Sequence, residues 1–225
     1  MRELALFDLD ETLIAGDSDF EWGQFLIDAG VLDRAVYEAR NQEFYAQYRA
    51  RTLDVAEYLD FAVRPLSRFS TVQLNAWHAE FLESRILPLV RPGARPLLAR
   101  YQGATQAIVT ATNAFVTGPI AAALGVPHLL ATDLEEVDGR FTGRSRGTPC
   151  FQHGKVTRLH EWLATRGERL EDYDRTWFFS DSMNDLPLLS IVTNPVTVHP
   201  DPHLRAHAMH AGWPILSLDT TTPTG

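Results

Sequence analysis

The chain has 225 residues, of which 45% are hydrophobic, and its formal net charge is -9. This composition supplies enough apolar surface for one large domain, or for a core domain with a smaller insert, and it argues against disorder. The negative charge repels nucleic-acid backbones and anionic lipid surfaces, so neither nucleic acid nor a membrane is expected as a partner.

The compartment can be predicted from what the sequence lacks. The first residues have no long apolar stretch of the kind found in a signal peptide, because Asp8 and Asp10 interrupt it, and no run of about 18 apolar residues could span a bilayer. The single cysteine, Cys150, excludes an internal disulfide. We therefore expect a cytoplasmic protein, either a monomer or a homodimer.

The first predicted element is a strand from Leu4 to Leu9, whose apolar run is typical of a strand buried on both faces. It runs into an acidic turn. From about Asp17 to Pro88, apolar residues recur at helical spacing with charged residues between them. We expect four helices in this region, with Thr52 and Ser70 as caps of the last two. Their predicted ranges are Phe20 to Asp28, Asp33 to Arg49, Leu53 to Val63 and Thr71 to Arg85.

After Pro88 strands and helices alternate, which predicts an α/β fold with a parallel sheet covered on both faces. Asp138-Gly139, within 133–144, is a hairpin signal. The expected strands are 105–110, 128–131, 176–179 and 196–199. The expected helices are 92–101, 115–124, 156–166, 185–189 and one from about 201. The Thr-Pro-Gly tail is expected to be frayed.

Two carboxylates, Asp8 and Asp10, stand at the carboxyl end of the first predicted strand. In open α/β sheets this edge is where ligands bind. Two negative charges this close repel each other unless a cation neutralises them, so a hard cation such as Mg²⁺ is expected. An isolated pattern of this kind is also compatible with a solvated acidic turn.

Two weaker patches follow along the chain. The apolar strand that ends at Thr110 runs into the hydroxyl-rich segment Thr110-Ala111-Thr112-Asn113 before a helix, and such a turn suits a phosphate oxygen. Threonines at strand ends also commonly serve as caps or turns. Lys155, at the start of a helix, could neutralise both a phosphate and the acidic cluster, although most lysines are solvated surface charges.

The fourth patch repeats the logic of the first. A buried apolar strand, Trp177-Phe178-Phe179, delivers Asp181 and Asp185 to the same edge of the sheet, where Asp181 would face the metal. These residues could equally cap a helix and stand in its first turn, and the two roles do not exclude each other.

Taken in order, the patches form an acidic pair, a hydroxyl, a lysine and a second acidic pair, each at a strand-to-helix transition. In this pattern the chain resembles the haloacid dehalogenase-like hydrolase superfamily over nearly its whole length, and it is most similar to the branch of phosphoserine phosphatases and related small-molecule phosphatases. The resemblance implies a Rossmann-like, doubly wound parallel sheet formed by residues 1–16 and 89–225. It also implies an inserted α-helical cap domain formed by residues 17–88.

The resemblance further implies the roles of individual residues. Asp8 would be the nucleophile that forms an aspartyl-phosphate, and Asp10 the acid that protonates the leaving alcohol and then the base that activates water. Thr110 and the Ala111 N–H would hold the phosphoryl group of a small phosphorylated metabolite, and Lys155 would bind it and balance its charge. A covalent intermediate lets one acid–base group serve both halves of the reaction.

The same resemblance implies a Mg²⁺ site. Asp8, the Asp10 carbonyl and Asp181 would ligate the ion, while Asp185 supports its waters or Lys155. The chain departs from the superfamily in its loops, because Ser180, Ala111 and Thr112 stand where glycine is frequent.

Substrate choice is expected to depend on the insert. Asp17 lies where phosphoserine phosphatases place an acidic residue that faces the substrate amine. Arg49, Arg51 and Arg64 are the candidates for a carboxylate-binding arginine, but none is a convincing match. The sequence therefore leaves phosphoserine and histidinol phosphate open as substrates.

Other functions are possible with the same residues. A phosphotransferase or mutase could use the same Asp8 intermediate. A phospho-accepting signalling domain is disfavoured, because it needs neither Asp10 nor a cap-sized insert. A zinc site would be compatible with the spacing of four histidines, but the carboxylates already supply a metal site of another kind. These histidines are His199, His203, His207 and His210.

Overall fold

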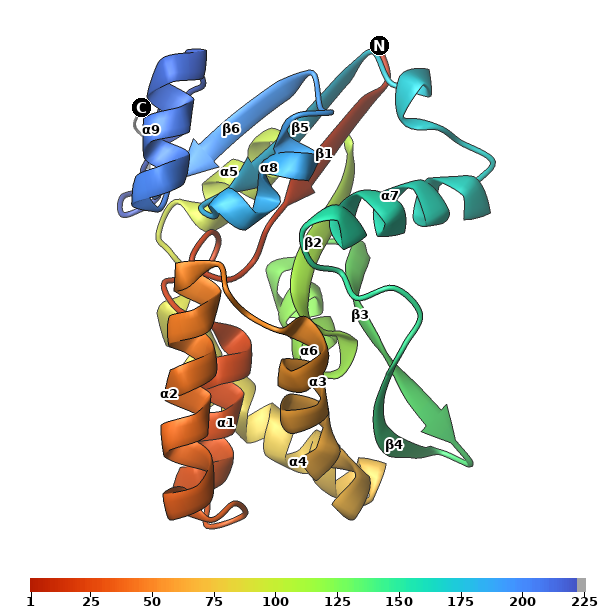
Figure 1. Ribbon diagram of the computed structural model, residues 1–225. Coiled ribbons are helices and arrows are strands. Elements are labelled where there is room, and N and C mark those ends of the chain that lie inside the picture. The colour runs from red at the N-terminus through yellow and green to blue at the C-terminus, as the bar shows by residue number, and fades with distance from the viewer. Residues whose placement is uncertain (222–225) are drawn as a thin grey trace.

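The computed structural model describes residues 1–221, so the predicted fraying of the tail concerns residues 222–225, which lie outside the described part. Within residues 1–221, seven strands form one sheet in the order β4-β3-β2-β1-β5-β6-β7, with β1 in the centre (Figure 1). Neighbouring strands are parallel except β3 and β4. The strands are β1 (Glu3–Phe7), β2 (Thr105–Asn113), β3 (His128–Val137), β4 (Arg140–Arg146), β5 (Arg175–Ser180), β6 (Asn194–Val198) and β7 (Ile215–Leu216).

Alternate residues of β1 pack into different layers. Ala5 and Phe7 belong to the apolar cluster that includes α5 and α6, whereas Leu4 and Leu6 belong to the cluster that includes α7, α8 and α9. All four side chains are fully buried. The sheet is therefore covered on both faces, which confirms the prediction of a doubly wound α/β fold. These helices are α5 (Ala94–Arg100), α6 (Ala114–Leu124), α7 (His153–Thr165), α8 (Leu186–Leu189) and α9 (Pro202–Ala211). A short 3-10 turn, η4 (Leu170–Asp172), precedes β5, and another, η5 (Met183–Asp185), precedes α8.

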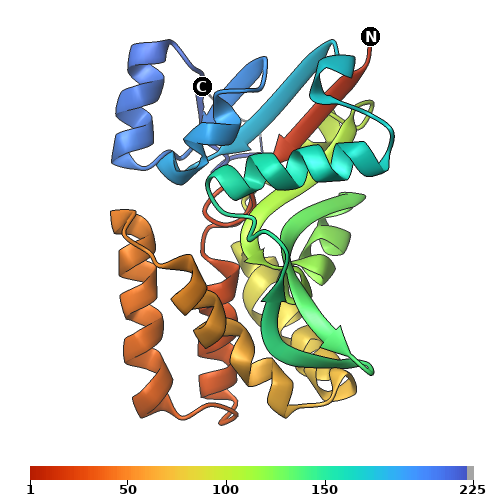
Figure 2. The ribbon, with the colours of Figure 1, turned by 45° about the vertical axis from the view of Figure 1, so that its right-hand side comes forward.

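The region predicted to be helical lies beyond the carboxyl ends of β1 and β2 (Figures 1 and 2). Each of its α-helices begins at a side-chain cap, and the caps are Asp17, Asp33, Asp54 and Ser70. The predicted cap at Ser70 is confirmed. The predicted cap at Thr52 is wrong, because the Asp54 carboxylate accepts N–H groups of the first turn of α3. The elements are α1 (Ser18–Asp28), α2 (Arg34–Ala50), α3 (Val55–Val63), η1 (Arg64–Arg68), α4 (Thr71–Phe81), the π-helical turn η2 (Leu82–Ile86) and η3 (Leu87–Leu89).

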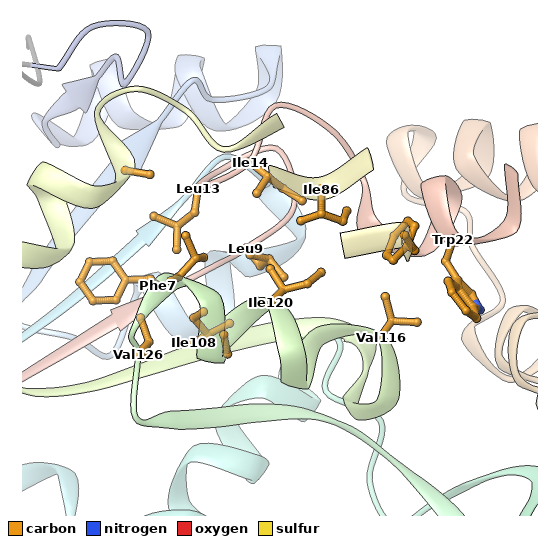
Figure 3. Packing of buried hydrophobic residues seen from close by; sticks show 14 of the residues in the cluster. Phe7, Leu9, Leu13, Ile14, Trp22, Ile86, Ile108, Val116, Ile120 and Val126 are labelled. Carbon is orange, nitrogen blue, oxygen red and sulfur yellow. The ribbon is translucent and has the colours of Figure 1, made fainter. Parts of the chain in front are cut away.

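The two segments that join these helices to the sheet run side by side. The Ala15 N–H donates to the Leu89 carbonyl at 2.8 Å, and the Arg91 N–H donates to the Leu13 carbonyl at 3.0 Å. One apolar cluster continues across this junction, from Phe7 to Trp22 (Figure 3). The division into residues 1–16 with 89–225 and residues 17–88 stays a prediction.

The second strand differs from its predicted form. Thr110-Ala111-Thr112-Asn113 was expected to be a turn, but it completes β2, where the pairing with β3 shifts register between Val109 and Asn113. A register shift of this kind is common next to functional sites because it changes the direction in which side chains point. The Asp138-Gly139 hairpin is confirmed, with both residues at positive φ, as a tight turn requires. In residues 1–221 no helix is long and apolar enough to cross a bilayer.

Candidate active site

Three neighbouring strands deliver polar side chains to one edge of the sheet. The strand order reverses at β1, with β2 on one side and β5 on the other, and ligands bind at such reversals in open α/β sheets. Asp8 follows β1, Thr112 lies at the end of β2, and Asp181 follows β5. Lys155 enters from the first turn of α7.

A buried lysine joins two of these loops. The Lys155 ammonium donates to Asp8 Oδ1 at 2.8 Å and to Asp185 Oδ2 at 2.7 Å, and no side chain of the three is more than 6% exposed. Burial alone would lower the pKa of Lys155, but the two carboxylates raise it above its usual value. Burial raises the pKa of Asp185 to about 6, against the opposing effect of Lys155.

The hydroxyl of Thr12 links Asp8 to a third carboxylate, that of Asp181. Its oxygen lies 3.1 Å from Asp8 Oδ2 and 3.2 Å from Asp181 Oδ1, and it accepts the Asp181 N–H at 3.1 Å. Burial, followed by the charge of Asp8, raises the pKa of Asp181 well above its usual value. Burial also raises the pKa of Asp8, against the effect of Lys155. The buried Asp8 carboxylate and the partly buried Asp181 carboxylate therefore meet at one hydroxyl group.

Asp10 is held by three donors. Its Oδ1 accepts the Ser18 N–H at 2.7 Å, and its Oδ2 accepts the Thr110 and Thr112 hydroxyls at 3.1 and 3.0 Å. Burial raises the pKa of Asp10, while these hydrogen bonds oppose the shift. The carboxyl group is thus fixed in orientation and takes a proton more readily than an exposed aspartate.

Thr110 occupies a different position from the one that its sequence motif suggested. Thr110 is fully buried and does not line the cleft described below. Its hydroxyl donates to the Asp10 carboxylate and accepts the Thr112 N–H. Ala111 and Thr112 do line it. Thr112 was missed as a functional candidate. The signal was present, because residues two apart on a strand share a face.

A cleft open to solvent separates the sheet edge from α1, α2 and α3. Among the described residues, 1–221, none that lines the cleft is a lysine, arginine or histidine, whereas Asp8, Asp10 and Asp17 all line it. Burial, followed by the charge of Asp10, raises the pKa of Asp17 well above its usual value. The walls are mainly aromatic and apolar: Phe20, Phe44, Tyr45, Tyr48, Leu53, Val55, Tyr58, Leu59 and Phe151.

The candidate arginines lie elsewhere. Arg49 and Arg51 line a separate hollow next to Asp181, and Arg64 forms an exposed ion pair with Asp60. In residues 1–221 no three histidine, cysteine, aspartate or glutamate side chains form a group that could hold a metal by themselves. The zinc hypothesis therefore has no support in the geometry.

Cys150 is buried away from the cleft. Its thiol donates to the Leu130 carbonyl at 3.4 Å, and burial raises its pKa to about 12. A thiol held in this protonated state is a poor nucleophile.

A strained loop positions Lys155. Gln152 has a φ of 49°, unusual for a residue other than glycine, and its carbonyl accepts the Lys155 N–H at 3.1 Å. A Cβ at Gly154 would stand 1.9 Å from the Pro149 carbonyl oxygen. Only glycine fits at Gly154, so the sequence Gly154-Lys155 is required by packing as well as by charge.

A hydrogen-bonded network lies behind the cleft wall. Asp19, only 6% exposed, accepts the Tyr58 hydroxyl and, at 3.3 Å, the Asn113 side-chain amide. Burial raises the pKa of Asp19 to about 6, although the bond from Tyr58 opposes the shift. The network joins α1, α3 and the end of β2.

A doubly wound sheet that gathers buried carboxylates and one lysine at its strand-order reversal defines an α/β enzyme acting on an anionic group. The sequence model of the haloacid dehalogenase-like hydrolase family matches residues 5–190 of this chain. The chain belongs to this family, as its motifs predicted, and within it to the phosphatases, which hydrolyse phosphoric monoesters.

Similar proteins agree with this assignment. A histidinol-phosphatase from Neisseria meningitidis is 44% identical, with 97% of this chain and 100% of that protein covered. A phosphoserine phosphatase from Mycobacterium tuberculosis is 32% identical, with 94% and 69% covered. A Bordetella pertussis protein of unknown function has a crystal structure with a TM-score of 0.91, 44% identity, and 96% and 98% covered. A substrate-bound phosphoserine phosphatase shares the fold, with a TM-score of 0.67, 20% identity, and 98% and 94% covered.

The first prediction concerns the loop before Lys155. Gly154→Ala should destabilise the protein by about 1–3 kcal/mol or more, because the new methyl group meets the Pro149 carbonyl, and should lower phosphatase activity by displacing Lys155. Chemical denaturation and hydrolysis of p-nitrophenyl phosphate measure the two effects. Gly103→Ala is the matched control: this exposed glycine has nothing within 4 Å of its new Cβ and its φ is not positive, so the change should leave stability unchanged or raise it by up to about 1 kcal/mol. Equal effects of the two substitutions would contradict the prediction.

A second prediction follows from the raised pKa of Asp19. Because the folded protein binds this proton more tightly than the unfolded chain, stability from Asp19 is present below pH 4 and is lost as the pH rises through about 6. The change is at most about 3 kcal/mol, since each pKa unit corresponds to about 1.4 kcal/mol. Urea denaturation between pH 4 and 7 should show that Asp19→Asn flattens this slope. A slope identical to that of the wild type would show that Asp19 does not cause it.

Proposed function

We propose that this protein is a Mg²⁺-dependent phosphatase that hydrolyses an amine-bearing phosphate monoester, histidinol phosphate in preference to phosphoserine, through an aspartyl-phosphate on Asp8. The observation that carries the proposal is the contrast between the two sides of the site. Asp8 has its charge balanced by Lys155, whereas the adjoining cleft is lined by acidic and aromatic side chains without a basic one.

Asp8 suits the role of nucleophile. The carboxylate lines the cleft, and Lys155 and Thr12 hold its two oxygens in fixed directions. In the first half of the reaction a bond forms between an Asp8 oxygen and phosphorus, while the bond from phosphorus to the leaving alcohol breaks. Lys155 lowers the repulsion between the carboxylate and the incoming dianion.

Asp10 suits the role of general acid and base. Burial raises its pKa towards neutrality, which increases the fraction that can give a proton to the leaving alkoxide. In the second half the ionised carboxylate takes a proton from the water that attacks the aspartyl-phosphate. The donors Ser18, Thr110 and Thr112 keep the carboxyl group in one orientation for both steps.

The donor set fits a magnesium ion. Asp8 Oδ2 and Asp181 Oδ1 both lie within about 3 Å of the same hydroxyl, and hard carboxylate oxygens are the ligands Mg²⁺ prefers. The charge of Asp8 contributes to the raised pKa of the partly buried Asp181, and a bound cation would relieve this repulsion. A bound Mg²⁺ would neutralise charge on the phosphoryl oxygens. Asp185, whose Oδ2 accepts from both Lys155 and Ser180, supports the lysine.

The cleft favours one class of leaving group. An ammonium group would find Asp17 and Asp10, and an aromatic ring would find aromatic walls, whereas the carboxylate of phosphoserine would find no basic partner among the lining residues. Histidinol carries both an amine and an aromatic ring and has no carboxylate. The 44% identity to a histidinol-phosphatase over 97% of the chain supports the same choice.

The reaction chemistry can be tested with one substitution. Asp8→Asn should lower kcat by roughly three orders of magnitude or more, since an amide is a far weaker nucleophile, with little loss of stability. EDTA should abolish wild-type turnover and added Mg²⁺ should restore it. Asp174→Asn, on an exposed loop before β5, is the control and should keep full activity. Turnover by Asp8→Asn at the wild-type rate would refute the nucleophile, and turnover unaffected by EDTA would refute the metal.

The substrate preference needs a separate experiment. Wild-type kcat/KM should be about tenfold or more higher for histidinol phosphate than for phosphoserine, because leaving a carboxylate unpaired costs at least 1–3 kcal/mol, or about a factor of ten. Phosphate release measured over a panel of phosphorylated metabolites gives this ratio. A preference for phosphoserine would overturn this part of the proposal while leaving the Asp8 chemistry intact.

A further inference from the structure

Tyr58 is a wall residue of the cleft whose hydroxyl is engaged from behind. It lies on α3, lines the cleft together with Asp17, and donates its proton to Asp19 Oδ2. A tyrosine hydroxyl has a single proton. What this oxygen can offer to a ligand therefore depends on whether the bond to Asp19 could run in the opposite direction.

Above about pH 6 Asp19 is ionised and has no proton to donate, so the bond runs from the Tyr58 hydroxyl to the carboxylate, and a backbone group orients the other partner of Asp19. The Val116 N–H, which can only donate, binds Asn113 Oδ1 at 3.1 Å. The Asn113 amide is thereby oriented with its NH₂ towards Asp19 Oδ1, at 3.3 Å. Asp19 thus accepts on one oxygen from Asn113 and on the other from Tyr58. The N-terminus of α6 thereby fixes the orientation of the Asn113 amide, and this amide holds the Asp19 carboxylate in place.

The consequence for the cleft is specific. Because the proton of Tyr58 is committed to Asp19, its oxygen can only accept a hydrogen bond from a ligand. The two side chains behind Tyr58 are tightly held: Asn113 and Asp19 are 1% and 6% exposed, and Asn113 also caps α6. An acceptor held in this way distinguishes a ring that carries an N–H from one that does not, because a plain ring leaves the accepting position of the Tyr58 oxygen unfilled once water is displaced.

We propose that Tyr58, oriented by Asp19 and Asn113, is a specificity-determining residue that accepts a hydrogen bond from a ring N–H of the leaving group. The inference rests on the proposed function and deepens it. Asp17 receives the ammonium group and Tyr58 the second nitrogen, so the site selects a phosphate ester whose alcohol carries two nitrogen donors. A monoester with an amine and a plain phenyl ring satisfies only the first.

The test compares two substrates that differ only in the ring. Histidinol phosphate and phenylalaninol phosphate share the amine and the phosphate, but only histidinol phosphate has a ring N–H. The wild-type ratio of their kcat/KM values should be about tenfold or more in favour of histidinol phosphate, and Tyr58→Phe should reduce that ratio towards one through KM. Tyr37→Phe, a half-buried tyrosine outside the cleft, should leave the ratio as in the wild type.

A second measurement uses only the wild-type protein and so does not depend on the folding of a variant. Methylation of either ring nitrogen of histidinol phosphate removes the single N–H of the neutral imidazole, so both methylated isomers should lose about tenfold in kcat/KM at a pH where the ring is neutral. Full activity with both isomers would overturn the inference. Wild-type protein that hydrolyses histidinol phosphate no faster than phenylalaninol phosphate, or Tyr58→Phe that keeps the wild-type ratio, overturns the inference and leaves the proposed function standing. Wild-type protein that hydrolyses neither amine-bearing ester in the presence of Mg²⁺ overturns both.

Discussion

The buried ammonium of Lys155 lies between the Asp8 and Asp185 carboxylates, at 2.8 and 2.7 Å, and the rest of the site is arranged around it. An isolated charge at this depth would be very costly, and only close partners of opposite sign offset the loss of water. Removing one partner from such a buried group typically costs about 3–5 kcal/mol, because the others stay charged and unpaired. The contact also joins α7 to the ends of β1 and β5. The strained backbone at Gln152 and the obligatory glycine at Gly154 show how tightly the chain is bent to bring the lysine there.

The helical insert is joined to the sheet domain unevenly. Trp22 of α1 packs against His78 of α4 and Phe115 of α6, and His78 Nε2 lies 2.7 Å from the Val116 carbonyl, so α1 and α4 share an apolar cluster with the core (Figure 3). The outer helix α2 contacts the sheet edge mainly through polar groups: the Tyr45 hydroxyl donates to Glu11, and the Asn184 amide donates to the Tyr48 carbonyl. Separating α1 from α6 would expose buried aromatic surface. The outer helix α2 is also held by apolar packing, because Phe44 is 1% exposed and its ring contacts Tyr58 and Phe61 of α3. The helices that wall the cleft are therefore held together by buried aromatic side chains, whereas α2 contacts the sheet edge through hydrogen bonds.

The sequence predicted the layers of the fold well because its signals were local and strong. Apolar runs ending in charged residues located β1 and β5, and Asp138-Gly139 located the hairpin. It predicted less well wherever the outcome depended on tertiary contacts. Thr112 was assigned to a turn because threonines are common in turns, but pairing with β3 extends β2 through it. The link from Tyr58 to Asp19 spans 39 residues, and no short pattern announces it. The charged residues that gather at the sheet edge could thus be predicted, but the hydrogen bonds that orient them could not.

The site combines two regions of opposite electrostatic character. Around Asp8, a lysine and a pair of carboxylates suited to Mg²⁺ create a place for a dianion. Across the cleft, Asp17 has its pKa raised by burial and by the charge of Asp10, with no basic side chain among the lining residues to compensate it. A ligand with negative charge at one end and positive charge at the other would complement both regions. A ligand with a second negative group would instead increase the repulsion around Asp17. With the phosphate beside Lys155 and the alcohol in the cleft, as proposed, a protein with a net charge of -9 would bind an anionic ester, because the favourable charges would be concentrated at the phosphate and reversed at the alcohol.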